Sequence, residues 1–129
     1  MNIGDSKISS ALRSRIRGLA SPAENEYRCS MEFDPGFTGF EGHFEGNPIV
    51  PGVCLIEAAR VIAEEAAGKA LKTLRIAQCR FRRPIFAGET AAVSLKIADA
   101  PTPGERSIRA DFRVGEALSA QFRLEVTKK

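Results

Sequence analysis

The sequence predicts an α+β fold in which a mainly antiparallel β-sheet wraps around one long α-helix. The first observation is the stretch 53–67, which lacks Gly and Pro and is apolar nearly all round, as a buried helix is. The second is an alternation of apolar and polar residues on both sides of that stretch, which indicates strands that bury one face. The long helix is the natural cover for that face.

The first element along the chain is predicted to be a short amphipathic helix, which Asp5 or Ser6 can cap and which Gly18 ends. Its apolar residues recur every four positions: Ile8, Leu12 and Ile16. The apolar stripe lacks the aromatic residues of a membrane-surface helix, so we expect this helix to pack against the domain. Residues 21–25 are predicted to form a turn.

The strands are predicted from their period of two. They cover residues 27–33, 74–81, 93–97, 108–114 and 118–126. Their alternation is broken at 84–89 and 99–105, where we expect loops, and at 115–116, where Gly and Glu indicate a tight hairpin.

Composition limits the classes of function. A chain of 129 residues is the size of one ordinary domain, so residues 1–129 are expected to form a single domain. A net charge of +3, without a basic stripe or a reading motif, does not indicate nucleic-acid binding. No apolar run approaches the roughly 20 residues of a membrane span. The N-terminus lacks the apolar centre of a secretory signal, and we expect a cytoplasmic protein.

The cysteines and the histidine argue against a metal site, and the sequence has no nucleotide-binding loop. Cys29, Cys54 and Cys79 have neither metal-like nor disulfide-framework spacing, and their apolar neighbours predict reduced, packed thiols. The chain contains a single histidine. We therefore expect no metal site and no cofactor. Cys54 is interpreted as a core residue, because no second histidine exists to activate it as a nucleophile.

Two residues stand out for their chemistry. His43, the only histidine, lies in a loop rich in Gly and Pro, and Glu57 lies in the apolar helix that follows. An acid in such a helix is costly unless it is paired, protonated or used. Each has a structural alternative, since a lone loop histidine is often an incidental hydrogen-bonding group and Glu57 could pair with Arg60 three residues on. Their combination favours a catalytic pair.

The segment GHFEGNPIVPGVCLIE, residues 42–57, resembles the active-site segment of the 3-hydroxyacyl-acyl-carrier-protein dehydratases of fatty-acid and polyketide type. That family has a Gly-His-Phe-Pro-Gly turn, then Pro-x-x-Pro-Gly, then a helix with an acid fourteen positions after the histidine, a spacing that His43 and Glu57 keep. Residues 80–89 resemble the family more weakly. The resemblance implies a hot-dog fold, in which the antiparallel sheet wraps around the central helix, here with a short N-terminal helix in addition.

The resemblance also implies a reaction, the conversion of a 3-hydroxyacyl thioester to the trans-2-enoyl thioester. His43 would be the base, and Glu57 from the other subunit of a homodimer would be the acid. The backbone at the helix start can receive the thioester oxygen, because the first N–H groups of a helix have no partner within it. The positions implied to bind the substrate and its oxyanion are Phe44, Pro51, Gly52 and Val53.

The implied substrate is carried on phosphopantetheine, either on acyl carrier protein or on coenzyme A. Two arginine-rich segments, 13–17 and 75–83, could meet an acidic carrier protein, although a solvated surface explains either equally well. Assembly beyond the homodimer, the acyl chain length and the pathway stay open.

The sequence departs from the family at three places. Glu45 stands where the family has Pro, Val61 stands where a Gln is common, and the N-terminal segment differs. Two alternative functions therefore remain. One is hydrolysis of acyl thioesters, which other hot-dog proteins catalyse. The other is a non-catalytic subunit that binds acyl thioesters.

Overall fold

The computed structural model describes residues 6–40 and 48–129 of the chain. Its strands form one sheet in the order β1-β2-β4-β5-β6-β3, and every neighbouring pair is antiparallel. The elements in chain order are α1 (Lys7–Arg13), β1 (Ile16–Ala23), β2 (Glu26–Glu32), the 3-10 turn η1 (Thr38–Phe40), α2 (Gly52–Ala67), β3 (Leu71–Phe81), β4 (Thr90–Asp99), β5 (Glu105–Val114) and β6 (Ala117–Lys128).

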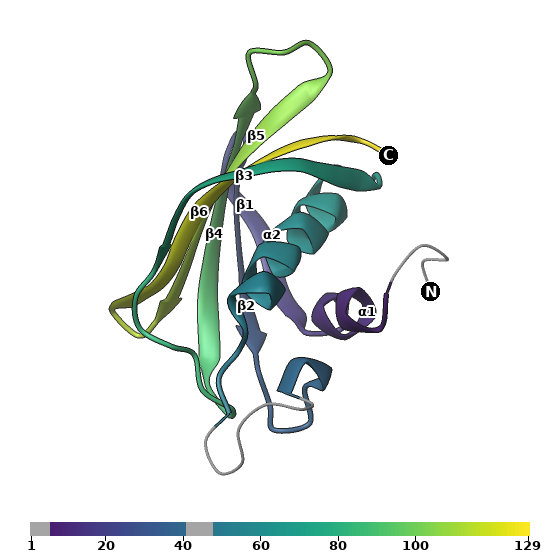
Figure 1. Cartoon of the computed structure of the whole chain (residues 1–129). Helices are drawn as coiled ribbons and strands as arrows, with labels where there is room; N and C mark the ends of the chain where they lie inside the picture. Colours follow the sequence, from purple (N-terminus) through teal and green to yellow (C-terminus); the bar gives the residue numbers. More distant parts are fainter. Residues whose placement is uncertain (1–5, 41–47) are drawn as a thin grey trace.

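The sheet curves around α2, and α1 lies on the other side of that helix (Figure 1). The inner face of the sheet supplies alternate buried residues, such as Leu95, Phe112 and Phe122, and α2 buries Ala59 and Ile62 against them. This layering confirms the predicted sheet wrapped around one long helix. No helix within residues 6–40 and 48–129 has both the length and the hydropathy required to cross a membrane.

The central helix α2 has the boundaries that its sequence predicts, to within one residue. It follows Pro51, whose φ of −60° and ψ of 143° place it just outside the helix. It ends at Gly68, which has a left-handed φ of 68° and whose N–H donates to the carbonyl of Glu64 at 2.8 Å. Glycine is the usual residue for that conformation, so Gly68 ends the helix sharply.

The N-terminal helix is shorter than predicted, and a strand was missed. α1 ends at Arg13, and residues 16–23 form the edge strand β1 instead of a helix end followed by a turn. Two side chains cap the helix early, because Ser14 Oγ and Arg15 Nη1 both donate to the carbonyl of Ala11, each at 2.8 Å. Ile16 has helical spacing from Leu12, but its strand pairing with β2 decides its conformation.

β3 is one continuous strand with two register shifts against β6, and the second explains an irregularity in its sequence pattern. The register with β6 shifts between Ala77 and Arg80, where Gln78 has a φ of 55°. The extra residue changes which positions of β3 face the core. Ile76 before the bulge and Phe81 after it therefore both lie opposite inner-face residues of β6. Cys79 falls in the bulge and is exposed. The prediction that all three thiols are packed is therefore wrong for this one.

Candidate active site

The predicted site residues divide into two groups. His43 and Phe44 lie in 41–47, outside the residues that the structure describes. Pro51, Gly52 and Val53 form the start of α2, and Glu57 follows slightly more than one turn later. The position of the histidine relative to the helix therefore stays a prediction. The start of the helix and Glu57 are described by their contacts.

The start of α2 offers backbone donors for which the described part of the chain supplies no partner. Pro51 occupies the N-cap position and provides no side-chain cap. The first hydrogen bond of the helix is donated by the amide of Cys54 to the carbonyl of Pro51, at 2.9 Å. The amides of Gly52 and Val53 precede that bond and have no partner within the helix. The helix dipole adds partial positive charge at this end. A developing oxyanion can therefore be stabilised here.

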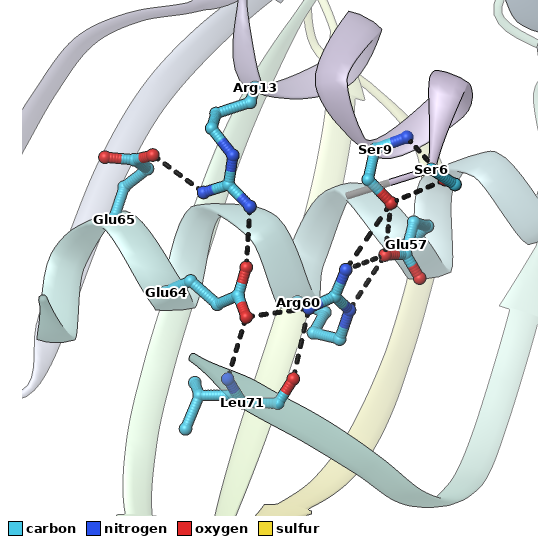
Figure 2. Close-up of polar contacts among 8 residues, drawn as sticks. All are labelled: Ser6, Ser9, Arg13, Glu57, Arg60, Glu64, Glu65 and Leu71. Carbon is cyan, nitrogen blue, oxygen red and sulfur yellow. Dashed lines mark hydrogen bonds and ion pairs between the residues drawn. The ribbon is translucent and has the colours of Figure 1, made fainter. Parts of the chain in front are cut away.

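Glu57 leaves the helix on the side of α1, and a hydroxyl of α1 binds it (Figure 2). Its Oε1 accepts from Ser9 Oγ at 3.0 Å, from Arg60 Nε at 2.8 Å and from Arg60 Nη2. The pairing with Arg60 that its i,i+3 spacing allows is thus present. All of these bonds reach Oε1, and among the described residues no hydrogen bond reaches Oε2. The side chain is 32% exposed.

Arg60 joins Glu57 to a second, buried acid. Its Nη1 lies 2.8 Å from Oε2 of Glu64 and donates to the carbonyl of Leu71 at 3.1 Å. The same oxygen of Glu64 accepts the N–H of Leu71 at 2.7 Å, and its other oxygen accepts Arg13 Nη2 at 2.7 Å. Figure 2 shows the resulting network, which ties α1, α2 and the start of β3 together.

The charges in this network compensate one another. The side chain of Glu64 is only 4% exposed and that of Arg60 11%, so either charge would be costly alone. Arg13 also binds the exposed Glu65 at 2.7 Å. Because the ion pair of Arg13 with the buried Glu64 joins α1 to α2, the network specifies how α1 docks on α2.

The side chain of Glu57 lines a hollow of about 510 Å³ between α1, the first turns of α2 and the start of β3. Its walls include Ile8, Ser9, Val53, Cys54 and Thr73. The carboxylate therefore has one anchored oxygen and stands beside open space. This arrangement could hold or deliver a proton at a bound substrate.

The two buried thiols, Cys54 beside the site and Cys29 in β2, behave as core groups. Cys54 is buried beside Glu57, and burial, with a smaller effect of the Glu57 charge, raises the pKa of its thiol. Burial raises the pKa of Cys29 to about 11. A thiol with a raised pKa supplies little thiolate near neutral pH, so burial agrees with the interpretation of Cys54 as a core residue.

Three polar residues of this site escaped the sequence prediction, namely Ser9, Arg13 and Glu64. Glu64 had a readable signal, because Glu57, Arg60 and Glu64 are spaced i, i+3 and i+7 and so share one helix face. Ser9 and Arg13 had none, since they reach Glu57 and Glu64 from a separate helix.

Comparison with protein families gives one match over most of the chain. The family model described as ApeI-like, ApeI dehydratase, matches residues 20–121. The match includes the described start of α2 and its acid, as well as residues 41–47.

Two curated proteins give similar information. The 3-hydroxyacyl-acyl-carrier-protein dehydratase FabZ of Syntrophobacter fumaroxidans is 33% identical over 96 residues, which are 68% of this chain and 65% of that protein. FabZ of Alkaliphilus metalliredigens is 34% identical over 92 residues, which are 66% of this chain and 62% of that protein. The matched region thus spans slightly less than two thirds of the length of these relatives.

Solved structures share the fold at lower identity. The dehydratase heterocomplex ApeI:P from Xenorhabdus doucetiae aligns with a TM-score of 0.71 and 20% identity, over 88% of this chain and 96% of that chain. The PaaI protein from the phenylacetic acid degradation operon of E. coli aligns with a TM-score of 0.67 and 17% identity, over 95% and 90% of the two chains. These alignments confirm the predicted hot-dog fold.

Proposed function

Since this chain belongs to the ApeI-like dehydratase family, we propose that it removes water from a 3-hydroxyacyl thioester to give the trans-2-enoyl thioester. One observation carries the proposal. α2 begins with the amides of Gly52 and Val53, which no side chain caps, and it presents the partly exposed carboxyl group of Glu57 five residues after Gly52. Dehydration needs both a donor for the thioester oxygen and an acid for the hydroxyl.

The proposed reaction has three tasks. His43 takes the proton from carbon 2, and the electron pair of that C–H bond becomes the double bond to carbon 3. The amide of Gly52, with that of Val53 beside it, stabilises the charge on the thioester oxygen while this happens. Glu57 gives its proton to the hydroxyl of carbon 3, and the C–O bond breaks to release water. His43 ends protonated and Glu57 ionised, and proton exchange with solvent restores both.

The place of His43 in this scheme rests on its spacing, nine residues before Gly52, together with the family match. Neutral imidazole is available near pH 7, which suits a base. Phe44 and Pro51 are proposed to contact the acyl chain. No cofactor is required, because each proton has a donor or acceptor in the chain.

The proposed substrate carrier is acyl carrier protein, which presents the acyl group on phosphopantetheine. The names of the FabZ relatives support this choice. A coenzyme A thioester has the same arm and is the alternative carrier.

We also propose a homodimer that forms along β3, so that Glu57 serves the partner's site. β3 is an edge of the sheet and pairs with β6 alone, and the three large hydrophobic side chains that the described residues expose lie on it or on the first turn of α2. These are Val53, Ile76 and Phe81. Both edge strands have two register shifts, but the other edge, β1, contains Pro22, which has no N–H to donate to an added strand and makes β1 the poorer template for pairing.

The test is hydration of a short 2-enoyl thioester, on carrier protein and on pantetheine. The reaction is measured as the loss of enoyl absorbance. His43→Ala and Glu57→Gln are compared with the wild type, and Glu65→Gln is the control, because it makes the same change at an exposed position of the same helix. We expect both site variants to lose a factor of at least about 100 in kcat, and the control to lose none. Full activity of either site variant would refute its role.

A second candidate, the non-catalytic binding subunit, is favoured by one observation, the pairing of Glu57 with Arg60 within the chain. It predicts binding of acyl-carrier protein with no turnover on any substrate. Release of free thiol without loss of enoyl absorbance would instead indicate thioester hydrolysis.

A further inference from the structure

Among the contacts of residues 6–40 and 48–129, Glu57 is held by one oxygen only. Ser9 and Arg60 together direct three hydrogen bonds at Oε1. A glutamate on an unpacked helix surface samples several rotamers, and three donors on a single oxygen select one of them. Oε2 is then left toward the hollow that Val53 and Thr73 help to line.

Arg60 is itself fixed from behind. Its Nη1 is bound by the buried carboxylate of Glu64 and by the carbonyl of Leu71, while Nε and Nη2 reach Glu57 (Figure 2). Because the guanidinium is planar, fixing one edge fixes the direction of the other. Arg60 therefore transfers the rigidity of the buried network to Glu57.

Ser9 is fixed in a comparable way by the first turn of α1. It is 3% exposed, its Oγ lies 2.9 Å from Oγ of Ser6, and its N–H donates to that same hydroxyl at 3.0 Å. Ser6 is the N-cap of α1, so the position of Ser9 depends on the helix cap rather than on a flexible loop.

We propose that Ser9 and Arg60 are positioning residues of the dehydration step, which anchor Oε1 of Glu57 and leave Oε2 to deliver the proton to the departing hydroxyl. This inference rests on the proposed role of Glu57 as the acid. It makes α1 a working part of the active site.

The test begins with Ser9→Ala, because this change removes the hydroxyl and keeps the N–H that caps α1. The matched control is Ser14→Ala, the same change in a residue that follows the same helix and bonds only locally, to Ala11. We expect Ser9→Ala to lower kcat about tenfold with KM within about twofold of the wild type, since misplacement of a catalytic group acts on the chemical step. We expect the control to leave kcat unchanged.

A double-mutant cycle separates positioning from mere stabilisation of the fold. If Ser9 acts through Glu57, then Ser9→Ala has little further effect on the residual kcat of Glu57→Gln. Arg60→Lys is a second variant, because one amine cannot span Glu57 and Glu64, and we expect kcat to fall at temperatures where the variant is folded. A Ser9→Ala kcat within twofold of the control, or a full tenfold loss in both backgrounds, would overturn the inference.

Failure of the inference is distinct from failure of the proposed function. An active wild type, an impaired Glu57→Gln and an unimpaired Ser9→Ala would leave the acid in place and remove its anchor from the mechanism. An inert wild type, or a fully active Glu57→Gln, would remove both.

Discussion

The ring of Phe81 lies against the bare Cα of Gly52, so close that a Cβ built on the glycine would stand 3.1 Å from Cζ of the ring. The end of β3 thereby covers the first residue of α2. Glycine at this position serves two purposes, because it admits the ring on one side and leaves its own N–H accessible for a substrate oxygen.

Gly52→Ala is predicted to reduce activity more than stability. The ring of Phe81 is half-exposed and can move by the few tenths of an ångström required, and Ala favours helix more than Gly does, so we expect the free energy of unfolding to change by less than about 1 kcal/mol. The methyl group crowds the proposed oxyanion site, and we expect kcat/KM to fall at least about tenfold. Denaturant unfolding and the hydration assay measure the two effects.

The control is Gly68→Ala, at the left-handed end of the same helix. It should cost about 1 kcal/mol of stability and leave kcat/KM unchanged. Equal activity of Gly52→Ala and wild type would remove Gly52 from the proposed site.

Glu64→Gln is predicted to destabilise the fold by about 2–4 kcal/mol. Its two oxygens accept from Arg13, Arg60 and the amide of Leu71, and the NH₂ group of Gln would face at least one of these donors. Glu65→Gln removes an exposed partner of the same Arg13 and should cost less than about 0.5 kcal/mol. Urea unfolding compares them, and similar losses for the two variants would show that the buried network contributes little.

Ile76→Glu is predicted to separate the proposed dimer. The side chain is 49% exposed on the edge strand β3, where a second copy would have to bury the added charge. Ala20→Glu, in the opposite edge strand β1, is the control and should remain dimeric. Sedimentation velocity measures both. A dimeric Ile76→Glu would place the interface elsewhere.

Stability is predicted to fall in acid through two ion pairs, Arg83–Glu89 and Arg15–Asp34. The hydrogen bond from Arg83 lowers the pKa of Glu89 below its ordinary 4.5, and that from Arg15 lowers the pKa of Asp34 below 3.8. Since the folded pKa values are depressed, both contributions are complete above the ordinary values and are lost as pH falls through the folded ones. We expect the loss of unfolding free energy from pH 6 to pH 3 to be smaller in Glu89→Gln than in wild type.

The fold could be predicted from the sequence because its signals are local. The period of two marks the inner face of most strands, and the Gly-free stretch ending at Gly68 marks α2. β1 could not be predicted in this way, because its residues are mostly exposed and their conformation depends on pairing with β2. The bulge at Gln78 likewise appears in the sequence only as a change of phase.

The candidate site could be predicted only in part. The spacing of Gly52 and Glu57 along one helix was readable, as was the possible contact with Arg60. The anchor at Ser9 and the burial of Glu64 depend on how α1 docks, and that docking is decided by contacts between residues about 50 positions apart. No local pattern carries such information.

The bond from the Leu71 amide to Glu64 sets the starting point of β3 at a fixed distance from the end of α2. Residues 68–70 are the whole connection between them. A deletion of one residue there would force a choice between that bond and the pairing register, and a slip of one position turns every side chain of a strand to its opposite face. The length of this short link therefore decides which face of β3 each of its side chains occupies, and so which side chains reach the edge along which we propose the dimer to form.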